Sequence, residues 1–195
     1  VGQGYYPEAV TSIRGGAEAD RIVLDGQGVA TIKRVTFKHP YLSLINSTIY
    51  GETTANLSMV RLDRGASYAV ISNNVIDVGS VWNINGIDMT GPSTRPFGED
   101  APNRCTIISN RVTGVVSSTG INVNGNYNLI TRNFFHDLGQ ADFVRLWGGT
   151  NTISQNTFSN IFLVPNSGNH VDFIQTFGLS VGWGSWGNII EQNTV

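Results

Sequence analysis

One nine-residue pattern recurs along this chain and constrains its fold more than any other feature. The pattern is apolar-x-x-Asn-x-apolar-x-x-apolar, and its copies occupy residues 70–78, 107–115, 130–138 and 153–161, with a restart at Ile190. The copies at 107, 130 and 153 start 23 residues apart, whereas the steps from 70 to 107 and from 153 to 190 are 37 residues, the same period plus 14. A period of this size, built from short apolar runs and turns, predicts a β-solenoid whose stacked coils bury a continuous core.

The asparagine of the repeat is expected to form a ladder along the solenoid. Its side-chain amide can hydrogen-bond to its equivalents, about 4.8 Å above and below, and to the bent backbone of the turn. Two frames fit the copy near residue 70, so its ladder residue is either Asn73 or Asn74, and residues 44–49 fit an earlier copy with Ser47 in the Asn position. The other predicted members are Asn110, Asn133, Asn156 and Asn193.

These repeats resemble those of the right-handed parallel β-helix superfamily, the fold of pectate lyases, related polysaccharide hydrolases and epimerases, and phage tailspikes. The resemblance covers nearly the whole chain, and "VGQGYYPEAV", "RIVLDGQGVATI" and "YLSLINSTIYG" are similar to the first coils of such proteins. It implies one all-β domain over residues 1–195, with coils of about 23 residues, lacking the N-terminal cap and the C-terminal coils of the family. It also implies an extracellular or cell-surface location.

A second set of aligned strands predicts which side chains fill the core. These strands are residues 86–91, 120–125, 143–148 and 173–178, with an earlier copy at 59–63. Side chains alternate along a strand, so every second residue should point inward. The expected core positions are Ile87, Ile121, Val144 and Ile174, together with Met89, Val123, Leu146 and Thr176.

The residues between these core positions are expected to face outward in three columns. The central column is Arg61, Asp88, Asn122, Arg145 and Gln175. The columns beside it are Asp63, Thr90, Asn124, Trp147 and Phe177 on one flank, and Gly86, Gly120, Phe143 and Phe173 on the other. Exposed rings stack on the apolar faces of sugars, while charged and amide groups bond to hydroxyls and carboxylates. The sequence therefore suggests either a carbohydrate surface or an ordinary solvent face covered by loops.

Two inserted loops favour the carbohydrate interpretation. Residues 92–105 and 179–188 lengthen two of the coils, and long loops on a rigid scaffold are where binding groups concentrate. The second loop carries Trp183 and Trp186 among glycines. The predicted substrate-binding residues are therefore Arg61, Asp63, Asn122, Asn124, Trp147, Gln175, Phe177, Trp183 and Trp186.

By resemblance, the leading hypothesis is a protein that binds and cleaves an acidic polysaccharide by elimination, as a lyase. Elimination needs a cation for the uronate carboxylate, a base and an acid. Arg145 is the candidate cation, and His170 or His136 the candidate base. No cofactor is required by the sequence, although Asp88 is a candidate ligand for calcium. The clustered carboxylates and the Lys-and-Arg pair of calcium-dependent lyases of this fold are missing.

Two other classes of function fit the same residues. A glycoside hydrolase needs two facing carboxylates, and Asp63 and Asp88 on neighbouring coils are candidates. A non-catalytic segment of an adhesin, tailspike or filament would use the same faces only to bind glycans or partner chains. Fold alone does not separate these classes.

Charge and hydropathy exclude several partners. Twelve Lys and Arg against fourteen Asp and Glu leave a net charge of −2, with no basic run for a nucleic-acid backbone. No apolar segment approaches the roughly 20 residues that span a bilayer. Cys105 is the single cysteine, so no internal disulfide forms, and it is expected to be buried.

The segment "GNHVDFIQTFG" contains the spacing His170-x-Asp172-x-x-Gln175, which resembles a metal motif. Alternation sends Gln175 to the face opposite the other two residues, which argues against a zinc site. The segment aligns with "ADFVRLWGG", so Asp172 and Asp142 are equivalent and are expected to end a turn and bond to backbone.

Overall fold

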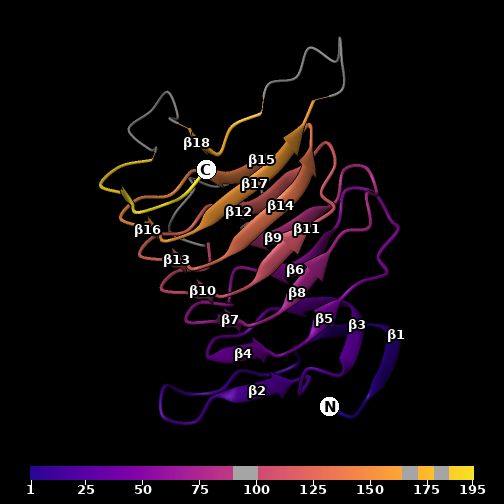
Figure 1. The fold of residues 1–195 in the computed structure, drawn as a ribbon. Helices are drawn as coiled ribbons and strands as arrows, with labels where there is room; N and C mark the ends of the chain where they lie inside the picture. The colour runs from indigo at the N-terminus through magenta and orange to yellow at the C-terminus, as the bar shows by residue number, and fades with distance from the viewer. Residues whose placement is uncertain (90–100, 164–170, 178–184) are drawn as a thin grey trace.

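The computed structural model describes residues 1–89, 101–163, 171–177 and 185–195 (Figure 1). Within these ranges there are nineteen β-strands and no helix. Neighbouring strands run parallel, and successive coils stack from the N-terminal end of the molecule to the C-terminal end (Figure 1). The chain is an all-β parallel solenoid, which confirms the predicted fold class.

One sheet contributes a short strand to each coil, and its neighbouring strands pair in parallel register. In spatial order its seven strands are β2 (Ile22–Asp25), β4 (Leu42–Ile45), β7 (Val70–Ser72), β10 (Thr106–Ile108), β13 (Leu129–Thr131), β16 (Thr152–Ser154) and β19 (Ile189–Glu191).

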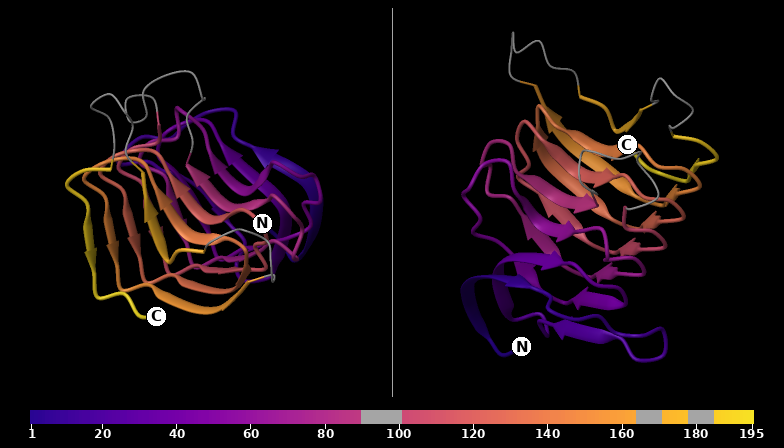
Figure 2. Two further views of the ribbon diagram at one scale, coloured as in Figure 1. Left: turned by 90° about the horizontal axis from the view of Figure 1, so that it is seen from above. Right: turned by 180° about the vertical axis from the view of Figure 1, so that it is seen from behind.

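The second sheet has two arms that meet at β3 (Ala30–Phe37), which also pairs with β1 (Gly4–Thr11). Arm A contains β5 (Thr48–Ile49), β8 (Val75–Asp77), β11 (Arg111–Thr113), β14 (Phe134–Gly139) and β17 (Thr157–Phe162). Arm B contains β6 (Ser58–Leu62), β9 (Asn85–Met89), β12 (Thr119–Val123), β15 (Asp142–Leu146) and β18 (Ile174–Thr176). Each coil passes from the seven-stranded sheet through arm A to arm B, and Figure 2 shows the coils lying over one another.

The predicted asparagine ladder lies at the turn between the seven-stranded sheet and arm A. Asn133 shows its chemistry: its Nδ2 donates to Ile107 O (2.9 Å) and to Asn156 Oδ1 (3.0 Å), while its own Oδ1 accepts from the backbone and side chain of Asn110. The same pattern extends to Asn193, and Ser47 stands at its other end. These bonds satisfy buried polar groups that would otherwise destabilise the turn.

The register near residue 70 is settled in favour of Asn74, which is buried and bonds to Asn110. Ile71 pairs with Ile107, which in turn pairs with Ile130, and Ile130 with Ile153. The steps between these partners are 36, 23 and 23 residues, and the step from Leu44 to Ile71 is 27, so the spacing of 23 holds between Ile107 and Ile153 and not along the whole solenoid.

A left-handed residue precedes each ladder position and bends the chain. Positive φ at these residues turns the strand sharply while the following asparagine holds the inner side of the bend. They are Asn46, Asn73, Ser109, Arg132, Gln155 and Gln192, with φ between 52° and 56°.

A second, shorter asparagine ladder lies at the turn from arm B back to the seven-stranded sheet. Cys105 N donates to Asn128 Oδ1, Asn128 N to Asn151 Oδ1, and Asn151 N to Asn188 Oδ1, each at 2.8 Å. Cys105 occupies the ladder position of its coil and is buried as expected, and this burial raises the pKa of its thiol to about 12. In the coils from Asn128 onward, two of the three turns are therefore fixed by side-chain amides.

Rows of apolar side chains fill the solenoid. Aligned inward residues include Ile71, Ile107, Ile130 and Ile153, then Ile76, Val112, Phe135 and Phe158, and in arm B Ile87, Ile121 and Val144. All are buried, and each contributes roughly 1.5–3 kcal/mol relative to an exposed side chain. The predicted core of arm B is buried except on β18, where Ile174 is half-buried and Thr176 is exposed.

One predicted outward column is wrong: Gly86, Gly120, Phe143 and Phe173 face the interior. Phe143 is fully buried, with its ring centroid 6.1 Å from Phe135 and 5.3 Å from Phe158. At Gly120 a Cβ would lie 2.5 Å from Phe143 O and 3.2 Å from the Phe135 ring. The chain bends just before β15, after left-handed Gln140, so two consecutive residues, Phe143 and Val144, point inward before alternation begins.

Candidate functional site

The outer face of arm B carries the predicted central column in register. Thr36 pairs with Arg61, Arg61 with Asp88, Asp88 with Asn122, Asn122 with Arg145, and Arg145 with Gln175. Parallel register places these residues about 4.8 Å apart along the solenoid axis. The structure thus brings together five residues that the sequence proposed as ligand contacts and adds Thr36 to their row.

Arg145 is held in place by the buried carboxylate of Asp142. Its Nε donates to Asp142 Oδ2 at 2.6 Å, and the backbone N of Asp172 donates to Asp142 Oδ1 at 2.9 Å. The Asp142 side chain is 2 % exposed and the Arg145 side chain 39 %. A charge-assisted bond of this length orients the guanidinium. The backbone bond to Asp142 was expected from the sequence, but the ion pair was not. Strict alternation would put Asp142 and Arg145 on opposite faces, whereas Phe143 and Val144 both point inward and leave Asp142 beside Arg145.

Two further carboxylates of the outer face of arm B are also engaged. Asp63 Oδ1 accepts from Arg61 Nε at 2.6 Å, and Asp88 accepts from Ser58 Oγ and Asn122 Nδ2, each at 3.3 Å. Asp88 is buried. Both predicted hydrolase carboxylates are therefore bonded to neighbours on the face.

An aromatic pair flanks this row. Trp147 and Phe177 stack with ring centroids 3.9 Å apart and planes 6° apart, and both are half-buried. In the coil before Trp147, Asn124 is buried, and its Oδ1 has no hydrogen-bond partner in the described structure; the same holds for Oδ1 of Asn122. A buried amide oxygen without a donor destabilises the fold. Protein atoms cover both oxygens, so they do not add acceptors to the outer face.

His136 lies on arm A, away from Arg145. Its Nε2 accepts from Arg111 Nε at 2.5 Å, and its Nδ1 is 2.5 Å from Asp137 Oδ2. Its ring stacks on Phe134, with centroids 4.7 Å apart. These contacts engage both ring nitrogens, Nε2 with Arg111 and Nδ1 with Asp137. The structure therefore separates this predicted base from the predicted cation.

Hydrogen bonds from His136 and Asn160 lower the pKa of the Asp137 carboxyl. Its folded-state pKa lies below the unfolded value, so its contribution to stability is present above about pH 4 and is lost as the pH falls through the folded-state pKa. We expect Asp137→Asn to destabilise the protein at pH 6 and to have a shrinking effect below pH 4. Urea midpoints of both proteins from pH 2 to 7 measure this, and a difference independent of pH would contradict it.

His170 and Trp183 lie outside the described residues. Trp186 is 58 % exposed, and its indole covers Gly149 at the turn that follows arm B. Of the tryptophans predicted to bind substrate, Trp147 thus lies on the outer face of arm B and Trp186 at the turn that follows it.

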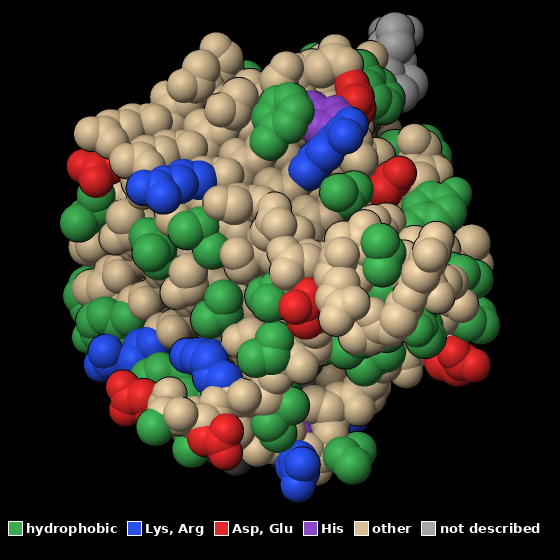
Figure 3. All heavy atoms as spheres, turned by 60° about the horizontal axis from the view of Figure 1, so that its bottom comes forward, with side chains coloured by type: hydrophobic (Ala, Val, Ile, Leu, Met, Phe, Trp, Pro, Cys, Tyr) green, Lys and Arg blue, Asp and Glu red, His purple; other side chains and the backbone are tan. Residues whose placement is uncertain are grey.

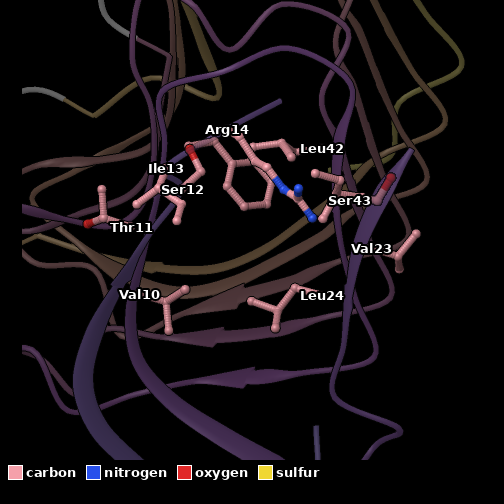
Figure 4. Close-up of a pocket in the computed structure, with 11 residues that line it drawn as sticks. Val10, Thr11, Ser12, Ile13, Arg14, Val23, Leu24, Leu42 and Ser43 are labelled. Atoms are coloured by element: carbon pink, nitrogen blue, oxygen red, sulfur yellow. The ribbon is translucent and has the colours of Figure 1, made fainter. Parts of the chain in front are cut away.

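A cavity of about 260 Å³ opens at the first coils (Figure 4). Val10, Leu24 and Leu42 line it, as Figure 4 shows. Phe37, which also lines it, and Leu42 belong to the hydrophobic core. The cavity is therefore an opening into the hydrophobic core between β1 and β2 and is not part of the candidate site.

Charged groups give little further indication of a ligand. Basic and acidic side chains are scattered over the face drawn in Figure 3 rather than gathered by sign. The described residues contain no group of three His, Cys, Asp or Glu side chains suited to a metal ion. Nor does any helix within them have the length and apolarity to cross a bilayer. Calcium at Asp88 stays a prediction.

The geometry defines a class of protein, a parallel β-solenoid with one polar and aromatic outer face. No family model and no curated protein sequence matches the chain. Among solved structures it is similar to the crystal structure of the Dettilon tailspike protein (gp208), with a TM-score of 0.58 and 16 % identity over 97 % of this chain. The chain spans 42 % of that tailspike's length. At this identity the likeness shows the fold alone.

Proposed function

We propose that this solenoid binds a polysaccharide along the outer face of arm B. The observation that carries the proposal is the stacked pair of Trp147 and Phe177 beside the in-register row that contains Asn122 and Arg145. The two rings cover one face of each other, so the pair offers a sugar its remaining apolar surface, and the oriented guanidinium offers donors to a hydroxyl or carboxylate.

The preorganisation of this face supports the proposal. Arg145 is fixed by Asp142 before any ligand arrives, so little side-chain entropy is lost on binding. The similarity to a tailspike protein agrees with a role in surface recognition, and we extend the proposed location to the cell exterior or a virion surface.

Cleavage of the bound chain is not part of this proposal and stays a prediction from the family resemblance. Elimination needs a base near the neutralised carboxylate. His136 is on arm A, and His170 is outside the described residues. Asp63 and Asp88 are engaged by Arg61, Ser58 and Asn122. Binding without chemistry is the function that the described geometry supports best.

Replacing Trp147 by alanine tests the proposal. We expect affinity for an acidic oligosaccharide to fall about 30-fold, or roughly 2 kcal/mol, because a buried aromatic contact at the centre of a site dominates binding. Titration calorimetry with oligogalacturonate, oligoguluronate and oligosialate measures this. Trp82→Ala is the matched control, since Trp82 is 55 % exposed on the turn between arms A and B. Equal affinities of the two variants, or no binding by the wild type, would refute the proposal.

A further inference from the structure

A row of tyrosines and arginine runs along the turn from arm B to the seven-stranded sheet. Backbone bonds align it: Tyr68 N donates to Asn103 O, Arg104 N to Asn126 O, and Tyr127 N to Gly149 O. Each member has a left-handed backbone conformation, with φ between 56° and 61°. We call this row the Tyr–Arg stripe; its members are Tyr41, Tyr68, Arg104 and Tyr127.

The residue types in the stripe are unusual for their backbone. Left-handed positions favour Gly, Asn and Asp, and a bulky residue there is strained. At the opposite corner of the seven-stranded sheet, the equivalent left-handed positions hold Asn, Ser, Arg and Gln. Three tyrosines at one corner therefore carry a local free-energy cost that asparagine or glycine would avoid.

In the first half of the stripe, Tyr41 and Tyr68 bind to each other and to a neighbouring side chain. Tyr41 and Tyr68 stack with centroids 4.6 Å apart, and Arg21 lies over the Tyr41 ring and donates from Nη1 to Tyr68 O at 2.5 Å. Burial and the neighbouring Tyr68 raise the pKa of Tyr41, and Glu18 adds negative charge beside it. These contacts explain the first half as internal packing.

In the second half of the stripe, Arg104 and Tyr127 are exposed to solvent. Arg104 lies over the ring of Tyr127, 4.9 Å from its centroid, and both side chains are exposed, Tyr127 by 53 %. Among the described residues, no carboxylate forms an ion pair with Arg104. Contact with the ring does not consume the N–H donors of the guanidinium. Such an arrangement is prepared for an anion bound beside an aromatic ring.

We propose that Arg104 and Tyr127 form an anionic-saccharide subsite separate from the outer face of arm B. Arg104 binds a sugar carboxylate through its N–H edge, and the Tyr127 ring packs against the same or the next sugar residue. Gly149 follows Tyr127 in the next coil, and the indole of Trp186 covers Gly149. Trp186 therefore extends the aromatic surface at this turn. The inference rests on the proposed function in taking a saccharide as the ligand.

Arg104→Gln tests this subsite against a matched control, Arg132→Gln. Arg132 has the same left-handed backbone, with φ of 56°, but its Nε donates to Gln155 and it lies at the opposite corner of the sheet. With oligogalacturonate, oligoguluronate and oligosialate as probes, we expect Arg104→Gln to weaken binding of at least one about tenfold. Arg132→Gln should change it less than twofold. Tyr127→Leu should weaken the same probe, and thermal melting confirms that each variant is folded.

Two readouts separate this inference from the proposed function. The Arg104 Nε–H resonance should shift on addition of the acidic probe and not on addition of maltohexaose. If Trp147→Ala lowers affinity but Arg104→Gln and Arg132→Gln behave alike, the subsite is disproved and the outer face of arm B stands. If Arg104→Gln alone lowers affinity, the subsite stands and the proposed function is wrong. Absence of binding to every acidic probe overturns both.

Discussion

Replacing Asn133 by alanine is expected to lower the free energy of unfolding by about 3–5 kcal/mol. The change removes both Nδ2 donors and the Oδ1 acceptor from a fully buried turn. The backbone N of Asn110 and the backbone O of Ile107 are then left without partners, and each unpaired buried group costs about 1–3 kcal/mol. Equilibrium unfolding in urea measures the loss.

The control for this prediction is Gln155→Ser. Gln155 belongs to the exposed row beside the ladder, where it bonds to Arg132 and Gln192, and serine occupies the equivalent left-handed position at Ser109. We expect a change within about 0.5 kcal/mol, as for other surface substitutions. If Asn133→Ala cost no more than this control, the ladder would be incidental to stability.

Phe143→Ala is expected to destabilise the protein by about 3–5 kcal/mol, the usual loss for a large ring removed from a packed core. Phe143 is fully buried among Phe135, Phe158 and Phe173. Phe134→Ala is the control, because Phe134 is 42 % exposed and contacts mainly His136; its loss should be about 1 kcal/mol. Similar losses for the two variants would mean that Phe143 faces outward, as strict alternation predicts.

The asparagine ladder and the central column of arm B could be predicted from the sequence, because both depend on local periodicity. A fixed Asn between apolar positions identifies a turn, and every second residue of a straight strand shares a face. Both rules fail where the chain bends: the turn before β15 puts Phe143 and Val144 on one side, and so conceals the ion pair between Asp142 and Arg145.

The second ladder was missed although its signal is present. Asn128, Asn151 and Asn188 each lie five residues before a member of the first ladder. In the preceding coil Cys105 takes that position, which interrupts the pattern. The Tyr–Arg stripe was missed for another reason: its members are separated by loops of unequal length, and only the backbone bonds between coils bring them into one row.

The two surfaces proposed here have different physical origins. On the outer face of arm B, the side chains are held by bonds to one another, as between Arg145 and Asp142. At the Tyr–Arg stripe, the ring of Tyr127 is the group among the described residues that orients exposed Arg104. Salt should therefore weaken binding at the exposed cation more than stacking on Trp147 and Phe177.

A crystal structure of the protein soaked with the acidic oligosaccharide that it binds most tightly tests the central claim most directly. The proposal predicts a sugar ring against Trp147 and Phe177, with a hydroxyl or carboxylate oxygen within hydrogen-bond distance of Arg145. An oligosaccharide bound elsewhere, with these three side chains uncovered, would contradict it.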